Sequence, residues 1–188
     1  MIAKTLQTLS LLLDDYLKRA FRLTESVMSL QPVNPDKSTD NKIHLFLVNI
    51  ERETTGGISH SRQAVTDGQY WKGSPVWQLN LYVILAAVFN EKQYAEGVQL
   101  LSGAVAFLQA NNTFAPSRTS VNISVEPVNI QPSELSNLWS ILGGQYHPSL
   151  LCKLRNIVID AGEIKRTGTV ITGKETEAKS KHGKNADI

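Results

Sequence analysis

The fold is decided where the chain reads Leu138-Trp139-Ser140-Ile141-Leu142-Gly143-Gly144, followed by Tyr146-His147-Pro148-Ser149. The apolar positions in the first part repeat at helical spacing, and paired glycines supply the positive φ angles that a helix C-terminus needs. From Leu150 to Asp160 the chain then has the composition of a long strand. The junction therefore predicts a helix, a tight turn and a strand, and it carries no catalytic group.

The same patterns, followed outward, predict the other elements. Helical spacing of apolar residues indicates helices over 2–23 and 91–110, and a short one that begins near Pro132. Alternation or apolar runs indicate strands over 43–50, 121–126 and 150–160, and we expect 76–81 to be extended and 82–89 to be helical. The sequence thus predicts an α+β fold with a mixed or mostly antiparallel sheet, flanked by two longer helices and one short helix.

Two of these elements come with a predicted orientation. In the second long helix, the positions expected to be buried are Tyr94, Val98, Leu101, Val105 and Leu108. In the last strand, alternation places residues 150, 152, 154, 156 and 158 on one face, and residues 151, 153, 155, 157 and 159 on the other.

Size and charge restrict the class of protein. The chain has 188 residues, of which 41% are hydrophobic, which suits one domain over residues 1–161 and a polar tail over 162–188 that is flexible unless bound to a partner. A net charge of +2 is too small to indicate a surface that binds nucleic acid. A single cysteine favours a reducing compartment, so we expect a cytoplasmic protein, and no apolar stretch is long enough for a membrane span.

Motifs for chemistry are absent or incomplete. Gly168 to Lys174 fits most of a phosphate-binding loop, but Glu175 replaces the Ser or Thr that would bind magnesium. The four histidines lack the spacing of a zinc site, and Cys152 shares a strand face with leucines, as an inert core thiol would. We therefore predict no catalytic residue, no cofactor and no metal, and leave a small-molecule enzyme with an unconventional site as the weaker alternative.

Six residues are candidates for contacts with a partner or another subunit. Glu51, Arg52 and Glu53 follow an apolar strand, and Lys153 and Arg155 make one face of the last strand basic. Trp71 lies between polar residues, where a tryptophan can anchor an interface. Ordinary solvated charge is the alternative explanation for Glu51, Arg52 and Glu53. Glu53 to Gly73 is polar and glycine-bearing, and we expect a mobile hairpin there.

Four stretches together resemble the tail-terminator, or cap, family of contractile injection systems. They are Asn49 to Glu53, Asn80 to Phe89, Leu138 to Gly143 and Tyr146 to Arg155, and the resemblance extends over residues 4–160. It implies a phage tail-terminator-like fold. It also implies a structural protein, without a reaction, that forms a homohexameric ring at the distal end of the inner tube and sheath of a phage-tail-like particle.

The resemblance implies partners as well. They are other copies of the chain, the inner tube protein and the sheath protein, with no nucleic acid and no membrane. Assembly is expected in the cytoplasm, in a particle that can be released. We expect Lys153 and Arg155 to meet Glu51 and Glu53 of a neighbouring copy, and Thr167 to Thr172 to add a strand to the sheath. The alternative is an adaptor that forms no ring and binds one partner through the 53–73 loop.

Overall fold

The computed structural model describes residues 1–34, 40–54, 63–66, 69–73, 76–117, 121–159 and 164–169. The chain divides into two compact units. The main unit comprises Met1–Ser59 and Val76–Ala161, and the small unit comprises His60–Pro75 and Gly162–Ile188. Each unit contains a sheet of its own.

The main unit is built on a six-stranded sheet in the order β1-β2-β5-β8-β7-β6. Three long strands dominate it, namely β2 (Lys42–Arg52), β5 (Trp77–Val88) and β8 (Ser149–Ile159). The shorter strands are β1 (Met28–Ser29), β6 (Thr113–Phe114) and β7 (Ile123–Pro127). Only β1 and β2 pair in parallel, and the other neighbours are antiparallel. The predicted α+β fold with a mixed, mostly antiparallel sheet is confirmed.

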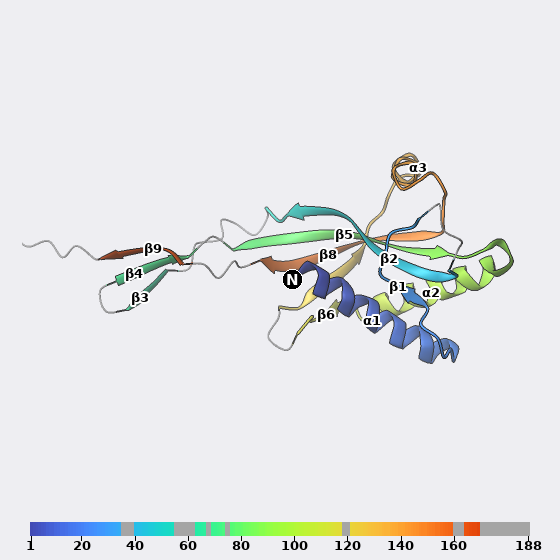
Figure 1. Ribbon diagram of the computed structural model, residues 1–188, viewed down its shortest axis with the longest axis horizontal. Coiled ribbons are helices and arrows are strands. Elements are labelled where there is room, and N and C mark those ends of the chain that lie inside the picture. Colours follow the sequence, from blue (N-terminus) through green and yellow to red (C-terminus); the bar gives the residue numbers. More distant parts are fainter. Residues whose placement is uncertain are drawn as a thin grey trace, which may run out of the picture. The chain divides into compact units, whose positions relative to one another are not determined.

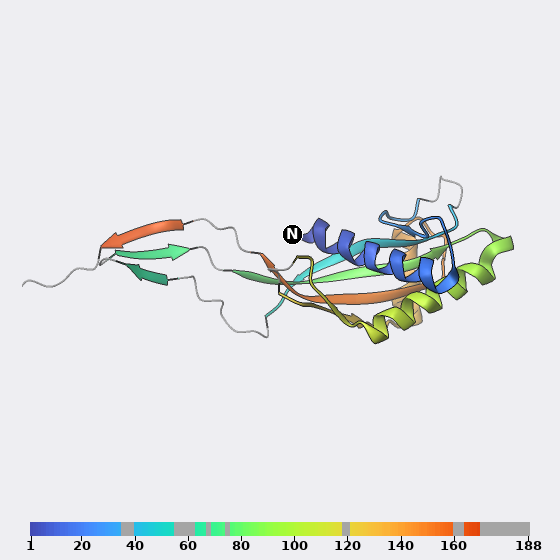
Figure 2. The same cartoon turned by 90° about the horizontal axis from the view of Figure 1, so that it is seen from below.

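Helices cover both faces of this sheet (Figure 1). On one face lie α1 (Ile2–Phe21) and α2 (Tyr94–Ala110), side by side in Figure 2, with a short 3-10 turn, η1 (Glu91–Gln93), before α2. On the other face, α3 (Pro132–Ile141) buries Trp139 against Phe46 and Ile84. The two longer helices and the short helix are confirmed, and each face has a separate apolar core.

The junction between α3 and β8 has the predicted geometry. Gly143 and Gly144 have φ values of 109° and 81°, and the Gly144 N–H donates to the Trp139 carbonyl at 2.8 Å. At the other end of α3, the Gln131 N–H donates to the Glu134 carboxylate at 3.2 Å, which satisfies a backbone donor that the first turn leaves unpaired.

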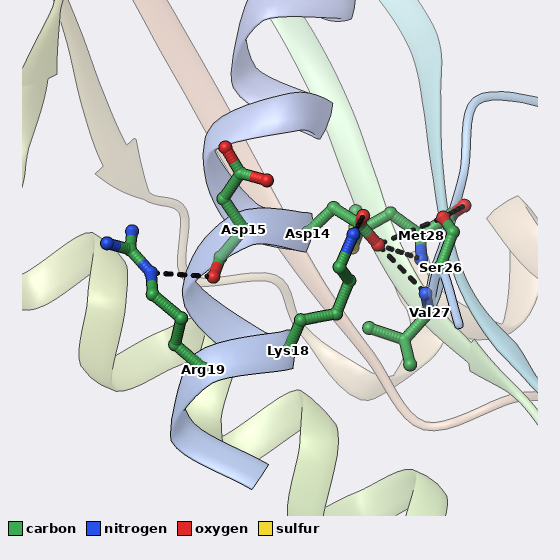
Figure 3. Close-up of polar contacts among 7 residues, drawn as sticks. All are labelled: Asp14, Asp15, Lys18, Arg19, Ser26, Val27 and Met28. Atoms are coloured by element: carbon green, nitrogen blue, oxygen red, sulfur yellow. Dashed lines mark hydrogen bonds and ion pairs between the residues drawn. The ribbon is translucent and has the colours of Figure 1, made fainter. Parts of the chain in front are cut away.

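The turn between α1 and β1 is fixed by one buried carboxylate, shown in Figure 3. Asp14 Oδ1 accepts hydrogen bonds from the Val27 N–H at 2.8 Å, the Met28 N–H at 3.1 Å and Ser26 Oγ at 3.0 Å. Lys18 Nζ lies 3.3 Å from Asp14 Oδ2. Burial by itself raises the pKa of Asp14, but these hydrogen bonds outweigh it and leave the pKa below its ordinary value.

The prediction for residues 76–89 was wrong in its second half. Instead of changing to a helix at Tyr82, the chain continues as one strand, β5, to Val88. Residues 83–88 of this strand are all buried, because α3 covers one face and α1 and α2 cover the other. A strand buried on both faces has no apolar alternation, so its pattern cannot be distinguished from that of a buried helix.

The predicted orientation of α2 was also wrong, except that Leu108 is buried as expected. The helix buries Gly97, Leu100, Ala104 and Leu108, whereas Tyr94 is 56% exposed and Val105 is 40% exposed. Close approach explains this choice of face. A Cβ at Gly97 would lie 2.6 Å from the Phe89 side chain, so the helix approaches Phe89 closely at this glycine.

A bulge in β8 corrects the predicted strand faces. Asn156 has a φ of 68°, and the register shifts so that Leu154 is opposite Leu81 while Ile157 is opposite Leu79. Leu154 and Ile157 therefore lie on the same face, although alternation placed them on opposite faces. The extra residue is exposed, as expected for a bulge.

The small unit is a three-stranded antiparallel sheet in the order β3-β4-β9. Its strands are β3 (Gln63–Thr66), β4 (Gln69–Gly73) and β9 (Ile164–Thr169). The hairpin expected within 53–73 is confirmed for β3 and β4, but its mobility stays a prediction. The domain boundary after residue 161 also stays a prediction, and most of the loop-like Gly168 to Lys174 stretch lies outside the described residues.

Candidate assembly interface

Charged side chains gather on the α3 face of the sheet, beyond the part that α3 covers. Lys153 in β8 lies opposite Tyr82 of β5 on one side and Glu126 of β7 on the other. Glu51 at the end of β2 lies opposite Asn80 of β5. The strand register thus brings together residues that are about 100 positions apart in the sequence.

These charges are paired within one chain. Arg155 donates to Glu53 Oε2 at 3.2 Å and lies 3.6 Å from the Glu126 carboxylate. Asn80 Nδ2 donates to the same Glu53 oxygen at 2.9 Å, and Lys153 Nζ lies 3.9 Å from Glu51. The hydrogen bond that Arg155 donates to Glu53 raises the pKa of the Arg155 guanidinium. The structure joins these predicted groups inside one protomer, and a contact of these residues with another subunit stays a prediction.

Arg52 differs from Glu51 and Glu53 in the face of the sheet on which it lies. Arg52 lies opposite Leu79, on the other face of the sheet, which is the face that α1 and α2 cover in the core. Its guanidinium carbon is 5.5 Å from the centroid of the Trp77 ring. Trp77 is 52% exposed. Among the residues that the structure describes, no carboxylate lies within ion-pair distance of Arg52. The guanidinium is therefore held by an aromatic ring and keeps its hydrogen-bond donors available.

Trp71, the remaining candidate, belongs to the small unit. Its backbone lies in β4, opposite Ala64 of β3 and Thr167 of β9. Its proposed role as an interface anchor stays a prediction.

Two apolar grooves border the segment from Val125 to Ile130, and neither was predicted from the sequence. One lies against α2 and is lined by Val105, Leu108, Val125, Pro127 and Leu150; the other lies against α3 and is lined by Val128, Ile130, Leu138, Ile141 and Leu151. Each has a volume of about 390 Å³. The only sequence signal was indirect, because Gly97 to Asn112 contains no charged residue.

The groups considered for chemistry are packed in the core or near it. Cys152 is buried, and burial raises the pKa of its thiol to about 12, which confirms the predicted core thiol. His44 and His147 are buried, and His44 Nε2 lies 2.8 Å from Asp40 Oδ1. Burial, followed by the proximity of His44, lowers the pKa of His147. In the described parts of the chain, no three potential metal-ligating side chains cluster, and no helix is long and apolar enough to cross a bilayer.

Comparison with known proteins identifies a family, and the solved structures with a similar fold include a terminator and a cap. The family of the Pvc16 N-terminal domain matches residues 4–173. The fold is similar to the sheath/tube terminator of an extracellular contractile injection system, PVC, in the extended state, with a TM-score of 0.60 and 14% identity. It is also similar to the tube-terminating cap of the anti-feeding prophage, AFP, with a TM-score of 0.61 and 16% identity.

Each match covers most of this chain but only part of the similar protein. The PVC match covers 92% of this chain and 63% of the terminator, and the AFP match covers 87% of this chain and 58% of the cap. The chain thus spans about three fifths of the length of these two proteins. At such identities the likeness establishes the fold. No curated protein sequence matches the chain.

Proposed function

The chain belongs to the family of the Pvc16 N-terminal domain, and from this membership we propose that it is a structural cap that ends the tube and sheath of a contractile injection system. The observation that carries the proposal is the family match over residues 4–173, on a fold similar to a sheath/tube terminator and a tube-terminating cap. The four stretches between Asn49 and Arg155 that resemble cap proteins support it from the sequence side.

The cap acts as a homohexameric ring. A ring of identical subunits needs two different, complementary surfaces on each protomer, and a sheet with two unlike edges can provide them. The ring is assembled in the cytoplasm and becomes part of the particle. Its action is mechanical, since it offers a binding surface toward the tube and sheath and none for further growth, and no catalysis is involved.

The inner tube protein and the sheath protein are the other proposed partners. The sheath contact is assigned to the small unit and the C-terminal tail. The strand β9 pairs with β4 inside the chain, so a sheath strand would have to add at an outer edge of the β3-β4-β9 sheet or to residues after Thr169.

Particle length tests the cap function directly. We expect that a producing strain without this protein makes tubes and sheaths of irregular, extended length in electron micrographs, because nothing stops polymerisation. Expression of the intact chain in that strain should restore a uniform length. Particles of normal, uniform length in the deletion strain would overturn the proposal.

A shortened chain tests the sheath contact separately. A variant that ends at Ala161 keeps the main unit and loses β9 and the tail. We expect it to form rings that co-purify with tubes but not with sheath. If the shortened protein still caps complete particles, the tail assignment is wrong while the cap function stands.

A further inference from the structure

The helix α2 is apolar on more of its surface than the main unit buries. One stripe packs on the sheet through Leu100, Ala104 and Leu108, and a second runs along the flank at Tyr94, Val98, Leu101 and Val105. Tyr94 and Val105 are exposed, and Val98 and Leu101 are only partly buried. A helix on a protein surface normally turns charged residues outward, yet none occurs from Gly97 to Asn112. This flank therefore has the character of a contact surface.

The flank continues into the grooves beside β7. Val105 lines the groove on the α2 side, and Ile141, which is 85% exposed, lines the groove on the α3 side. Ile141 has the largest exposed fraction among the large hydrophobic side chains that the structure describes. We name this area the β7-edge surface, and define it by Tyr94, Val98, Val105, Pro127 and Ile141.

The rim of the β7-edge surface is acidic. Glu126 lines the groove on the α2 side, and Glu134 lines the groove on the α3 side. Of these, Glu126 is partly neutralised by Arg155 at 3.6 Å. An apolar area with carboxylates around it fits a partner that presents an aromatic or aliphatic group together with a cation.

The opposite edge of the same sheet presents such groups. Within the described residues, β1 covers the outer edge of β2 only at Ile43 and His44. Near the far end of β2, Ile50 is 44% exposed and Arg52 stacks on the exposed Trp77. We name Ile50, Arg52 and Trp77 the β2-edge surface. It has the side chains that dominate binding energy in protein interfaces, an arginine and a tryptophan.

We propose that the β7-edge surface of one copy binds the β2-edge surface of the next copy in the ring. The inference rests on the proposed ring and names its two mating faces. They lie toward opposite sides of one sheet, because β6 covers β7 only at Ile123 and Ser124, just as β1 covers β2 only at Ile43 and His44. The two surfaces differ from each other, which is the condition for a head-to-tail ring. The Arg52 guanidinium meets the acidic rim, and Trp77 covers the apolar flank of α2.

Charge substitutions on either surface test the assignment with the intact chain. Val105→Glu places a like charge inside the acidic rim, and Arg52→Glu removes the cation. We expect each variant to raise the protein concentration needed for half-assembly about tenfold or more, measured by light scattering on a sizing column. Tyr94→Glu serves as a second variant of the β7-edge surface, because Tyr94 is more exposed than Val105 and its substitution spares the core.

Mixing the two variants gives the sharper test. The Val105→Glu chain keeps its β2-edge surface and the Arg52→Glu chain keeps its β7-edge surface, so an equimolar mixture should form a complex of two chains, about twice 20.8 kDa, that cannot grow. Each variant alone should be a monomer at the same concentration. Leu11→Glu and Arg19→Glu are matched controls, since both change exposed residues of α1 that belong to neither surface, and they should assemble like the parent chain.

The outcomes separate the interface from the ring. If the parent chain forms rings and the surface variants form them equally well, the assignment of faces is wrong and the cap function is untouched. If the two variants are monomers but their mixture gives no pair, the faces do not mate with each other and the proposal is overturned. A parent chain that stays monomeric at every concentration and in purified particles would contradict the ring and the interface together.

Discussion

The carboxylate of Asp14 connects the first helix to the first strand, so it is where a single substitution tests the packing of the N-terminus. Asp14→Asn replaces an ionised acceptor of three hydrogen bonds by a weaker, neutral one. We expect the free energy of unfolding to fall by about 1.5–3 kcal/mol, the range for hydrogen bonds to charged groups. Chemical denaturation measures this. Asp15→Asn is the matched control, because Asp15 is exposed and is engaged through its backbone carbonyl, 3.0 Å from Arg19 Nε.

The same carboxylate predicts a dependence of stability on pH. The pKa of Asp14 is lower in the folded chain than in the unfolded chain, so the folded state favours the ionised form. This contribution is complete above the unfolded pKa, about 4, and is lost as the pH falls through the lower folded pKa. We expect the difference in unfolding free energy between the parent chain and Asp14→Asn to be constant from pH 7 to 5 and to shrink in acid below about pH 4. A difference that stays constant down to pH 2 would contradict the lowered pKa.

Among the elements, α2 shows how a close approach overrides helix propensity. Gly97→Ala would improve the intrinsic helix propensity by about 1 kcal/mol. The new Cβ would lie 2.6 Å and 2.7 Å from Cδ2 and Cγ of Phe89, atoms near the root of a packed ring, which must shift. Overpacking of this kind costs about 1–3 kcal/mol. We therefore expect a net decrease in the melting temperature, measured by circular dichroism.

Gln99→Ala gives the reference for that experiment, because it improves propensity at an exposed position of the same helix. It should melt at the same temperature as the parent chain or slightly higher. A Gly97→Ala variant that is as stable as Gln99→Ala would show that Phe89 moves aside at no cost, and the close packing of α2 would then not explain its orientation.

How far the sequence predicts an element depends on how many of its faces are buried. The helix α1 and the short helix α3 each bury one stripe, and both helices were predicted from the helical spacing of their apolar residues. The strand β5 is buried on both faces, and α2 is apolar on most of its surface. Neither element therefore shows the alternation of apolar and polar positions that would reveal that β5 is a strand or which face α2 buries. In β8, the bulge at Asn156 changes the faces of later residues, and alternation contains no sign of it.

The charged cluster on the α3 face of the sheet was predictable only in part. Glu51, Glu53, Lys153 and Arg155 were found because charges beside apolar strands are visible in the sequence. Their pairing within one protomer was not, because it depends on strands from distant parts of the chain becoming neighbours. The predicted stripe of α2 was correctly identified as apolar, but its members Tyr94 and Val105 are exposed, whereas Leu108 is buried as predicted. A sequence pattern specifies that a face avoids water, but not whether the same chain or another copy covers it.

On the scale of the whole molecule, the two sheets imply two units that respond differently to truncation. A chain that ends at Ala161 lacks β9. The strand β4, Gln69 to Gly73, then pairs with β3 on one side and has lost its partner strand on the other. A two-stranded hairpin is marginal in water, so we expect the amides of β4 to exchange with solvent much faster than in the intact chain. The main unit keeps its sheet and both cores, and its free energy of unfolding should change by no more than about 0.5 kcal/mol.

Hydrogen exchange read by mass spectrometry separates these responses, with β5 as the internal control. Peptides from residues 77–88 should exchange alike in both chains, since β5 lies between β2 and β8 in the main sheet. Peptides from residues 63–73 should lose protection only in the shortened chain, because their third strand comes from residues 164–169. Loss of protection in β5 as well, together with a drop in unfolding free energy above about 1 kcal/mol, would show that the C-terminal segment stabilises the main unit. In that case, failure of the shortened chain to bind sheath could no longer be attributed to the tail alone.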